Sequence, residues 1–473
     1  MSDQHTAYSP AALTERGKDL LISVSGIRGT IPAGLDPVNT AAFAQALASV
    51  SGRRVVIGED ARPTGPALKQ ILTGTLLACG KEVIDVGLAP TPTVKAAVAL
   101  HADAGVMISA SHNPLQWNGF KLMQKGGFFF DAAMNAKWLA ALEANAKTGA
   151  GPAVPYKKLG TLSQRDAIDD HIKAVLKQLP LLEKIRAKKY RVVVDGVAGA
   201  GREALPRLLE ALGCRVVRLY CDPAPDFPRP PEPTPKALKE FGKLVQSKKA
   251  AVGFALDPDA DRLVCGGPRT GAINEEYSLP LAFYGLMAGN KQEKVRKRAS
   301  VVLNLSTATL LDSVAAQFGV PVYRSAVGEA NVVAEMRKRK SIFGGAGNGG
   351  VIHPDVPSFG RDTLIGAALI LQAMAERDLK SVEELLGEIP PLYMQKTKFD
   401  FEREHLQAIF GRFRDGFESG VRVDERDGLH LSFPDGDWLH VRASNTEPIL
   451  RVIAQAGSPR ALKERIARAQ ALL

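Results

Sequence analysis

The sequence contains few cysteines, few aromatic residues and no long hydrophobic run. Its 473 residues include four cysteines, at Cys79, Cys214, Cys221 and Cys265. Their spacing fits neither a zinc site nor the dense disulfide framework of a small secreted domain. We therefore expect free thiols and a cytoplasmic protein, because a reducing compartment keeps cysteines unpaired.

Membrane and secretion signals are also missing from the chain. No apolar segment approaches the roughly 20 residues that a membrane-spanning helix needs. The nearest, Leu364 to Met374, is typical of a buried helix. The first twenty residues are polar and contain Asp3, Glu15 and Asp19, unlike a signal peptide. We expect residues 1–19 to form a loose extension, and we expect no membrane partner.

Charge is unbalanced, with a formal net charge of +11 at pH 7. The lysines and arginines are scattered, and the basic segments 236–249 and 291–298 are typical of solvated helix faces. Aromatic residues make up 6% of the chain and do not interleave with the basic ones, as they do on single-strand-binding surfaces. We therefore expect no nucleic-acid partner, whereas a positive field favours small anionic ligands.

Predicted strands and helices alternate along most of the chain, which is long enough for several domains. Strands are expected at 54–58, 82–86 and 104–109, then at 190–195, 215–220 and 250–256, then at 300–305, 320–324 and 341–343. This pattern predicts three related α/β domains with mixed, mainly parallel sheets. The tail differs: strands at 429–433, 438–442 and 449–454, with a hairpin signal at Asp435-Gly436-Asp437 and a helix from Pro459, predict a smaller α+β domain.

Glycine- and proline-rich segments near 150–162, 266–271 and 388–394 are expected to be linkers. They divide the chain into the extension 1–19, α/β domains at 20–160, 161–268 and 269–390, and the α+β domain at 391–473.

Ser109-Ala110-Ser111-His112-Asn113-Pro114 follows an expected buried strand. Pro114 disfavours helical continuation, so Ser111 and His112 are expected on an exposed turn at the carboxyl end of that strand, where α/β sheets bind ligands. A serine there can be a nucleophile or carry a phosphoryl group. A turn in which Ser and Asn only bond their own backbone is equally open.

A second loop places Asp257, Asp259 and Asp261 at alternate positions after another expected strand. Three such carboxylates can converge on one hard cation. An EF-hand is excluded, because its sixth position holds Arg262 and its twelfth Pro268. A solvated acidic turn remains open, although Arg262 beside the carboxylates favours a site for phosphate as well as metal.

Two further loops contain candidate ligand-binding residues. The segment 343–350 has five glycines within seven residues, which allow close backbone approach to a ligand, although a flexible turn is the alternative. Arg442-Ala443-Ser444-Asn445-Thr446, with Arg451 nearby, combines residue types that contact phosphate, although it can also be an ordinary turn or cap.

In this order, the four loops resemble those of the α-D-phosphohexomutase superfamily, which includes phosphoglucomutases, phosphomannomutases and phosphoglucosamine mutases. Ser25-Gly26-Ile27-Arg28-Gly29-Thr30 and Gly328-Glu329-Ala330-Asn331 add to the resemblance, which covers the chain from about Leu20 to its end. It implies three α/β domains and a smaller phosphate-binding fourth around a central cleft. It also implies transfer of a phosphoryl group between O6 and O1 of a hexose phosphate, through a phosphoserine and a hexose 1,6-bisphosphate.

The resemblance also assigns roles to residues. It implies that Ser111 is the phosphoserine and that Ser111, Asp257, Asp259 and Asp261 hold Mg²⁺. His112, Lys121, Arg28 and Arg262 become candidates for proton transfer and charge stabilisation. Lys121 matches the family's proposed general acid/base, and we expect burial beside other cations to lower its pKa, whereas a surface lysine is the alternative. The phosphate that is not reacting is assigned to Arg442, Ser444, Asn445, Thr446 and Arg451, and the sugar to Gly328, Gly345, Ala346 and Asn348.

One position departs from the family pattern. Many members have a glutamate that holds the sugar hydroxyls where this chain has Ala346, and each lost charge-assisted contact costs about 1.5–3 kcal/mol. Three outcomes of this replacement are open: another residue makes the lost contacts, the substrate is a different sugar, or the activity is weak. Gly347-Asn348-Gly349-Gly350 favours a phosphoglucosamine mutase, whereas Ser444-Asn445-Thr446 is more typical of phosphogluco- and phosphomannomutases. A catalytically impaired sugar-phosphate-binding homologue is a further alternative. We expect a monomer or a homodimer.

Overall fold

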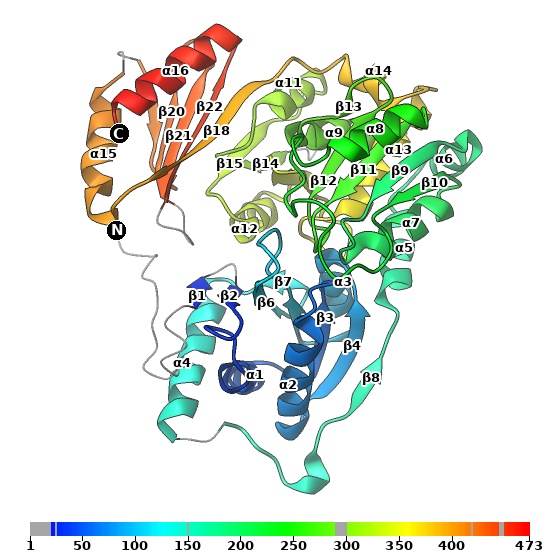
Figure 1. Cartoon of the computed structure of the whole chain (residues 1–473), viewed down its shortest axis with the longest axis vertical. Helices are drawn as coiled ribbons and strands as arrows, with labels where there is room; N and C mark the ends of the chain where they lie inside the picture. The colour runs from blue at the N-terminus through cyan, green and yellow to red at the C-terminus, as the bar shows by residue number, and fades with distance from the viewer. Residues whose placement is uncertain (1–19, 24–25, 149–150, 289–299, 418–419, 444–448) are drawn as a thin grey trace.

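The computed structural model describes residues 20–23, 26–148, 151–288, 300–417, 420–443 and 449–473, which form four sheets with flanking helices (Figure 1). The expected extension 1–19 lies outside these ranges, and so do Ser25, Ser444, Asn445 and Thr446.

The first sheet has the strand order β1-β2-β6-β5-β3-β4-β8, with β7 paired to β6. Its strands are β1 Leu21–Ser23, β2 Gly26–Thr30, β3 Arg54–Glu59, β4 Glu82–Leu88, β5 Ala104–Ile108, β6 Trp117–Gln124, β7 Phe128–Phe129 and β8 Leu162–Gln164. Its helices are α1 Pro37–Val50, α2 Gly65–Ala78, α3 Thr91–His101 and α4 Ala132–Thr148. Strands β5, β3 and β4 are parallel, and β6 runs antiparallel to β5.

The second and third sheets repeat this plan of parallel strands extended by antiparallel ones. The second has the order β10-β9-β11-β12-β13, with β9 Arg191–Asp195, β10 Arg215–Leu219, β11 Val252–Leu256, β12 Leu263–Gly267 and β13 Gly271–Ala272. The third has the order β15-β14-β16-β17, with β14 Val301–Asn304, β15 Val322–Ser325, β16 Phe343–Ala346 and β17 Gly350–Ile352. Their helices are α5 Ala167–Leu176, α6 Leu182–Lys188, α7 Gly201–Ala211, α8 Lys239–Ser247, α9 Ser278–Met287, α11 Leu310–Gln317, α12 Glu329–Arg339, α13 Thr363–Glu376 and α14 Val382–Leu386.

The fourth sheet is antiparallel, in the order β18-β22-β21-β20-β19. Its elements are β18 Tyr393–Asp400, α15 Leu406–Asp415, β19 Arg422–Asp424, β20 Leu429–Ser432, β21 Trp438–Ala443, β22 Ile449–Ala456 and α16 Pro459–Ala471. The predicted fold class is therefore confirmed: three α/β domains are followed by a smaller α+β domain.

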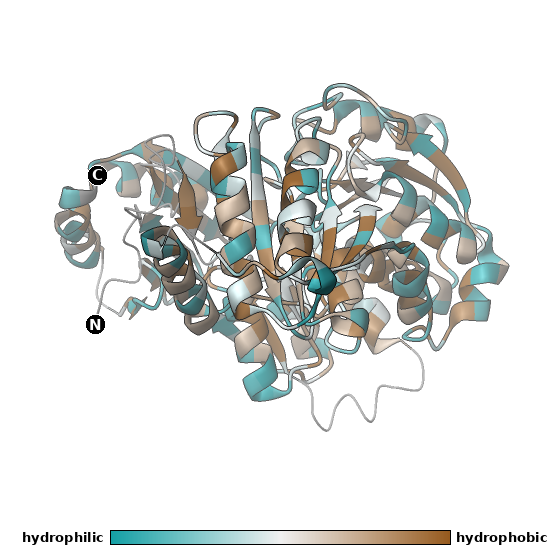
Figure 2. Cartoon of the chain, turned by 90° about the horizontal axis from the view of Figure 1, so that it is seen from below, coloured by the Kyte–Doolittle hydropathy of each residue, from teal (hydrophilic) through white to brown (hydrophobic). Residues whose placement is uncertain are grey.

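The largest hydrophobic core joins the second and third domains. Helix α13 is apolar on all sides and buried from Thr363 to Ala375, as a helix without a polar face must be. Asp362 caps this helix by accepting a hydrogen bond from the Leu364 amide. In Figure 2 the apolar segments lie mainly on the inner strands and helices, and hydrophilic segments lie mainly on the outer helices.

Two expected boundaries do not coincide with the sheets. Strand β8 pairs with β4, so the first sheet continues past residue 160. The expected linker at 266–271, next to the boundary at 268, is instead the β12–β13 hairpin, in which Gly267 pairs with Gly271. Gly271 has a φ of +70°, a conformation that glycine adopts easily, so this residue forms part of a tight turn and not of a flexible connection.

All four cysteines are buried with free thiols, as expected. Among the described residues, no helix is long and apolar enough to cross a membrane.

Candidate active site

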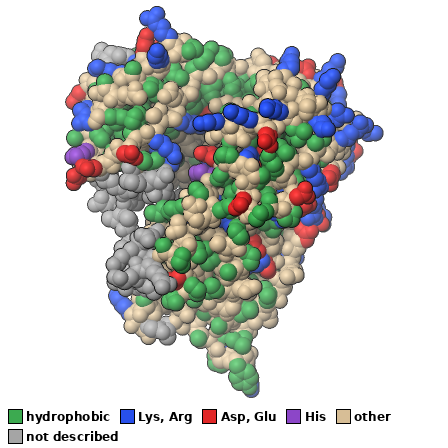
Figure 3. Space-filling model, viewed as in Figure 1, with side chains coloured by type: hydrophobic (Ala, Val, Ile, Leu, Met, Phe, Trp, Pro, Cys, Tyr) green, Lys and Arg blue, Asp and Glu red, His purple; other side chains and the backbone are tan. Residues whose placement is uncertain are grey.

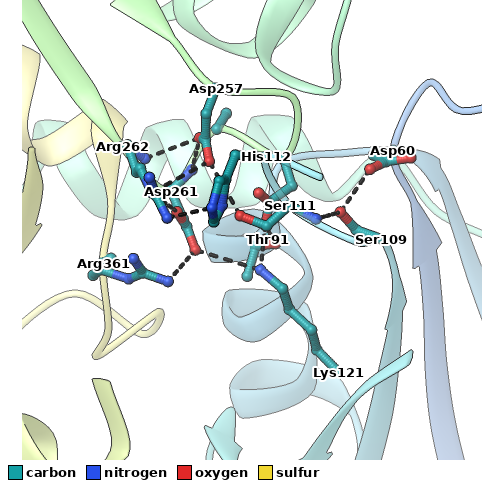
Figure 4. A network of polar contacts seen from close by, with 12 residues as sticks. Asp60, Thr91, Ser109, Ser111, His112, Lys121, Asp257, Asp261, Arg262 and Arg361 are labelled. Atoms are coloured by element: carbon teal, nitrogen blue, oxygen red, sulfur yellow. Dashed lines mark hydrogen bonds and ion pairs between the residues drawn. The ribbon is translucent and has the colours of Figure 1, made fainter. Parts of the chain in front are cut away.

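The loops that follow β5 and β11 meet at one point. Figure 4 shows Ser111 of the first domain facing Asp257 and Asp261 of the second. The Ser111 hydroxyl donates to Asp257 Oδ2 at 3.3 Å. A candidate nucleophile and a cluster of carboxylates thus lie together, at the carboxyl ends of one strand from the first sheet and one strand from the second.

Ser111 is 2% exposed, so the expectation of an exposed turn was wrong for this residue. Its φ of 53° lies in the left-handed region, which is uncommon for serine and requires support from the surroundings. The buried guanidinium of Arg62 supplies that support. It donates to the carbonyl oxygens of Ser111 and Asn113, both at 2.7 Å, and to those of Pro114 and Trp117 at 2.8 and 3.0 Å.

A second set of contacts, made by Ser109 and Asp60, fixes the same loop. The Ser109 hydroxyl donates to Asp60 Oδ2 at 2.6 Å and accepts from the Ser111 amide at 2.9 Å. Burial raises the pKa of Asp60 to about 6, although Arg62 opposes this shift. Neither Asp60 nor Arg62 was predicted from the sequence. Their position directly after β3, the neighbour of β5, was the available signal.

Asp257, Asp259 and Asp261 are completely buried, and one oxygen from each lies within 4.8 Å of the others. The Asp257 carboxylate accepts from the amides of Asp261 and Arg262 at 3.0 and 3.1 Å. Burial and the two neighbouring carboxylates raise the pKa of Asp257 well above its usual value. The solvated acidic turn is therefore excluded.

The three carboxylates fit a divalent cation. Oδ1 of Asp259 and Oδ1 of Asp261 are buried and accept no hydrogen bond from any described residue. Buried carboxylate oxygens without donors are costly unless a cation binds them. All ligand atoms here are hard oxygens, as Mg²⁺ and Ca²⁺ prefer.

Lys121 on β6 reaches this cluster and is 4% exposed, which excludes a surface lysine. Its Nζ donates to Asp259 Oδ2 and lies 3.4 Å from Asp261 Oδ2. Burial lowers the pKa of Lys121, but Asp259 and Asp261 outweigh it, and the pKa is raised overall. The expected lowering was therefore wrong, because the nearest charged groups are carboxylates and not other cations.

His112 lies between the serine and the arginines (Figure 4). Its Nδ1 is 2.9 Å from a guanidinium nitrogen of Arg262, which can only donate, so Nδ1 accepts and the ring is neutral. The positive charge of Arg262, followed by burial and Arg28, lowers the pKa of His112 well below its usual value. Arg28 itself donates to Asn113 Oδ1 at 3.0 Å.

An ion-pair chain that the sequence analysis missed joins the site to the third domain. Arg361 pairs with Asp261 and, at 3.1 Å, with Glu329, and Glu329 also pairs with Lys95 of α3. Glu329 belongs to the expected Gly328 motif. Gly328 precedes α12 with a φ of 123°, which favours glycine.

Gly345 and Ala346 end β16, and residues 347–349 connect it to β17. The Gly347 amide donates to Thr307 Oγ1 at 3.0 Å. Asn348 Oδ1 is buried and has no hydrogen-bond partner among the described residues. Asn348 lines a cavity of about 270 Å³ together with Arg262 of the second domain and Arg451 of the fourth.

Arg442 and Arg451 are directly opposed on β21 and β22. Two like charges in this arrangement repel unless an anion lies near them, and Asp427 Oδ2 lies 3.6 Å from Arg442 Nε. Arg442 is 7% exposed, and burial lowers its pKa. Figure 3 shows charged side chains around the hollow beside the fourth domain. The structure thus brings Arg451 together with Arg262 and Asn348 around one cavity.

Comparison with known proteins agrees with this arrangement. Four family models match: phosphoglucomutase/phosphomannomutase alpha/beta/alpha domains I, II and III at residues 20–148, 169–270 and 282–393, and the C-terminal domain at 374–472. A Thermococcus kodakarensis protein named "Phosphoglucomutase/phosphomannomutase" is 33% identical over 94% of this chain and 96% of its own. A Thermococcus gammatolerans protein named "Probable phosphoglucosamine mutase" is 34% identical over 95% of this chain and 97% of its own.

A solved structure of a phosphoglucomutase/phosphomannomutase family protein from Burkholderia thailandensis has the same fold. It is 24% identical, its TM-score is 0.80, and the match covers 98% of this chain and 97% of that one. Together with the buried serine and the carboxylate cluster, these matches establish that the chain belongs to the phosphoglucomutase/phosphomannomutase family of the α-D-phosphohexomutase superfamily and is an intramolecular phosphotransferase.

Proposed function

We propose that this phosphohexomutase converts glucosamine 6-phosphate to glucosamine 1-phosphate through a phosphoserine at Ser111 and a hexose 1,6-bisphosphate intermediate. The observation that carries the proposal is the buried Ser111 hydroxyl, 3.3 Å from Asp257 in a loop held by Arg62. A covalent phosphoryl carrier divides one difficult transfer into two in-line steps.

The charged residues around Ser111 suit each part of this reaction. Mg²⁺ bound by Asp257, Asp259, Asp261 and the phosphoserine would neutralise charge on the transferring group. Arg262 and Arg28 face the same loop and would stabilise negative charge. Lys121 is protonated and buried, which suits donation of a proton to the departing serine oxygen. The neutral His112 ring would orient the Arg262 guanidinium.

The other end of the substrate would bind the fourth domain. Arg442 and Arg451, with Ser444, Asn445 and Thr446, would hold the phosphate that is not reacting, which positions the sugar for transfer. The bisphosphate must then turn over, so that each phosphate faces Ser111 once. This geometry requires one phosphate site on each side of the sugar.

Two loops and two named relatives bear on the choice of hexose. The Gly347-Asn348-Gly349-Gly350 loop and the relative named as a phosphoglucosamine mutase favour glucosamine phosphates. The relative named as a phosphoglucomutase/phosphomannomutase, together with Ser444-Asn445-Thr446, favours glucose or mannose phosphates as the second candidate. Ala346 is the only motif position that favours an impaired binding protein, and the complete Ser111 and Asp257 sites weigh against it.

An assay with Mg²⁺ and a catalytic amount of hexose 1,6-bisphosphate tests the proposal. Glucosamine 6-phosphate, glucose 1-phosphate and mannose 1-phosphate are compared with the wild type and with Ala346→Glu. We expect the wild type to prefer glucosamine 6-phosphate. Preference for another sugar would identify that sugar phosphate as the substrate in place of glucosamine 6-phosphate. Activity only in Ala346→Glu would show that the transfer site is complete and that sugar recognition has diverged.

A further inference from the structure

Glu275, which no motif of the family pattern includes, lines the same cavity as Asn348, Arg262 and Arg451. It begins the short 3-10 helix η3 (Glu275–Tyr277), directly after β13. The Asn274 side chain caps this turn by accepting from the Glu276 amide at 2.9 Å. A carboxylate from a different segment thus reaches the cavity beside the loop in which Ala346 replaces the usual glutamate.

The Glu275 carboxylate has one oxygen in an ion pair and one without a hydrogen bond among the described residues. Oε1 lies 2.8 Å from Lys396 Nζ, on β18 of the fourth domain. Oε2 is buried and accepts no hydrogen bond from any described residue. A buried carboxylate oxygen without a donor is costly. A ligand in the cavity that donates a hydrogen bond would remove this cost.

Glu276 holds the arrangement against the sugar loop. Its Oε2 accepts from the Ala308 amide at 3.0 Å, and its Oε1 lies 2.8 Å from Lys396 Nζ. A Cβ added at Gly347, the residue after Ala346, would lie 2.0 Å from Glu276 Oε2, so the carboxylate packs directly on the loop backbone. Glu276 therefore serves the framework. Of the two glutamates that line the cavity, Glu232 pairs with Arg262 at 2.8 Å, and Glu275 lies beside the Ala346 loop.

The cavity has charges of both signs. Glu275 and Glu276 share the ammonium of Lys396. Arg262, Lys398 and Arg451 contribute positive charge to the lining, and Glu232, paired with Arg262, contributes negative charge. A ligand that matches has an ammonium or hydroxyl donors at one end and a phosphate at the other. A 2-amino-2-deoxyhexose phosphate has both groups.

We infer that Glu275 is the specificity-determining residue that replaces the missing glutamate at Ala346, and that its carboxylate selects a 2-amino-2-deoxyhexose phosphate. This inference rests on the proposed function. Hydrogen bonds between a carboxylate and a charged or hydroxyl donor are stronger than neutral ones, so one such residue can decide between sugars. Asn348 adds a neutral acceptor to the lining of the same cavity.

Equilibrium binding separates this inference from the proposed reaction. Dissociation constants of glucosamine 6-phosphate and glucose 6-phosphate are measured by calorimetry in a Ser111→Ala background, where no transfer occurs. We expect Glu275→Gln and Glu275→Ala to weaken glucosamine 6-phosphate binding about 10-fold or more. Glu275→Gln keeps the shape and an acceptor, so glucose 6-phosphate binding should change less than about 3-fold.

Rescue and control variants complete the test. Adding Ala346→Glu to Glu275→Ala should restore most of the lost affinity, which a merely structural role would not predict. Glu388→Gln, at an exposed glutamate paired with Arg377, should bind both sugars as the wild type does. Unchanged glucosamine 6-phosphate affinity in both Glu275 variants would overturn the inference without contradicting the proposed mutase activity. Absence of turnover with every sugar in the wild type would instead overturn the proposed function.

Discussion

The Arg62 guanidinium donates a 2.7 Å hydrogen bond to the carbonyl oxygen of Ser111 and holds that residue in a left-handed conformation. We expect Arg62→Lys to slow phosphorylation of Ser111 and to lower the free energy of unfolding by about 3–5 kcal/mol, because one ammonium cannot replace the guanidinium at every buried acceptor. Urea denaturation and the rate of phosphorylation by a hexose 1,6-bisphosphate measure the two effects. Arg53→Lys, at a side chain that is 77% exposed, is the control and should change neither. Wild-type behaviour of Arg62→Lys would show that the loop keeps its shape without this contact.

Phosphorylation should be confined to one of the two serines in the loop. Intact-mass analysis after incubation with a hexose 1,6-bisphosphate should show an added mass of about 80 Da, the mass of one phosphoryl group. Ser111→Ala should abolish this species. Ser109→Ala should still form the phosphorylated species, but more slowly. The Ser109 hydroxyl only supports the loop, because it accepts a hydrogen bond from the Ser111 amide and donates one to Asp60. Loss of the species in Ser109→Ala with retention in Ser111→Ala would reverse the assignment.

Divalent metal should stabilise the folded protein, because the three clustered carboxylates repel one another. At a Mg²⁺ concentration 100 times the dissociation constant, the free energy of unfolding should rise by about 2.7 kcal/mol. Asp257→Asn keeps the shape of the side chain but removes one negative charge, so most of this gain should disappear. The exposed cluster Glu402, Glu404 and His405 provides the control, and Glu404→Gln should respond to Mg²⁺ as the wild type does. An equal gain in Asp257→Asn would place the stabilising metal elsewhere.

The fourth domain should lose stability in acid because of His430. Burial, together with His440, lowers the pKa of His430 to about 3. The unfolded chain takes up this proton at a pH near 6.5, so the contribution of His430 is complete above that pH and falls as the pH drops toward 3. The expected slope is up to about 1.4 kcal/mol per pH unit for this residue. Amide hydrogen exchange of β20 and β21 between pH 7 and 4.5 measures it.

His430→Phe keeps an aromatic ring to stack on Trp438, whose centroid lies 5.2 Å away, but cannot be protonated. It should therefore flatten the pH dependence. The matched substitution His405→Phe, at a side chain that is 61% exposed, should not. An unchanged slope in His430→Phe would assign the acid sensitivity to other groups.

The parts of the fold that the sequence predicted are those with strong local patterns. The buried strand before Ser111 and the helix at Leu364 are each a nearly continuous apolar run, and both were found. The strand β18 was not predicted, because it lies at an edge of its sheet and its centre, residues 395–398, is a continuous polar run without apolar alternation. The hairpin at 266–271 was taken for a linker, because glycine marks both.

Within the site, the residues recovered from sequence are those that lie inside contiguous motifs. Asp60, Arg62 and Arg361 act from other segments and become neighbours of Ser111 and Asp261 only through the pairing of strands and the docking of domains. The pKa of Lys121 was predicted in the wrong direction for the same reason. The direction of the pKa shift depends on carboxylates that are distant in sequence, such as Asp259, which is 138 residues from Lys121. No local pattern reveals that these groups are close in space.

The ion pair between Glu275 and Lys396 joins two domains. The proposed binding of the sugar by Glu275 therefore depends on how those domains are arranged. Any rotation that carries β18 away from the third sheet separates the ammonium from both glutamates and removes one wall of the cavity. Glu275 would then be solvated and would hold the sugar less firmly. Opening of the cleft would therefore loosen the ligand, as the proposed turnover of the bisphosphate between its two transfers requires.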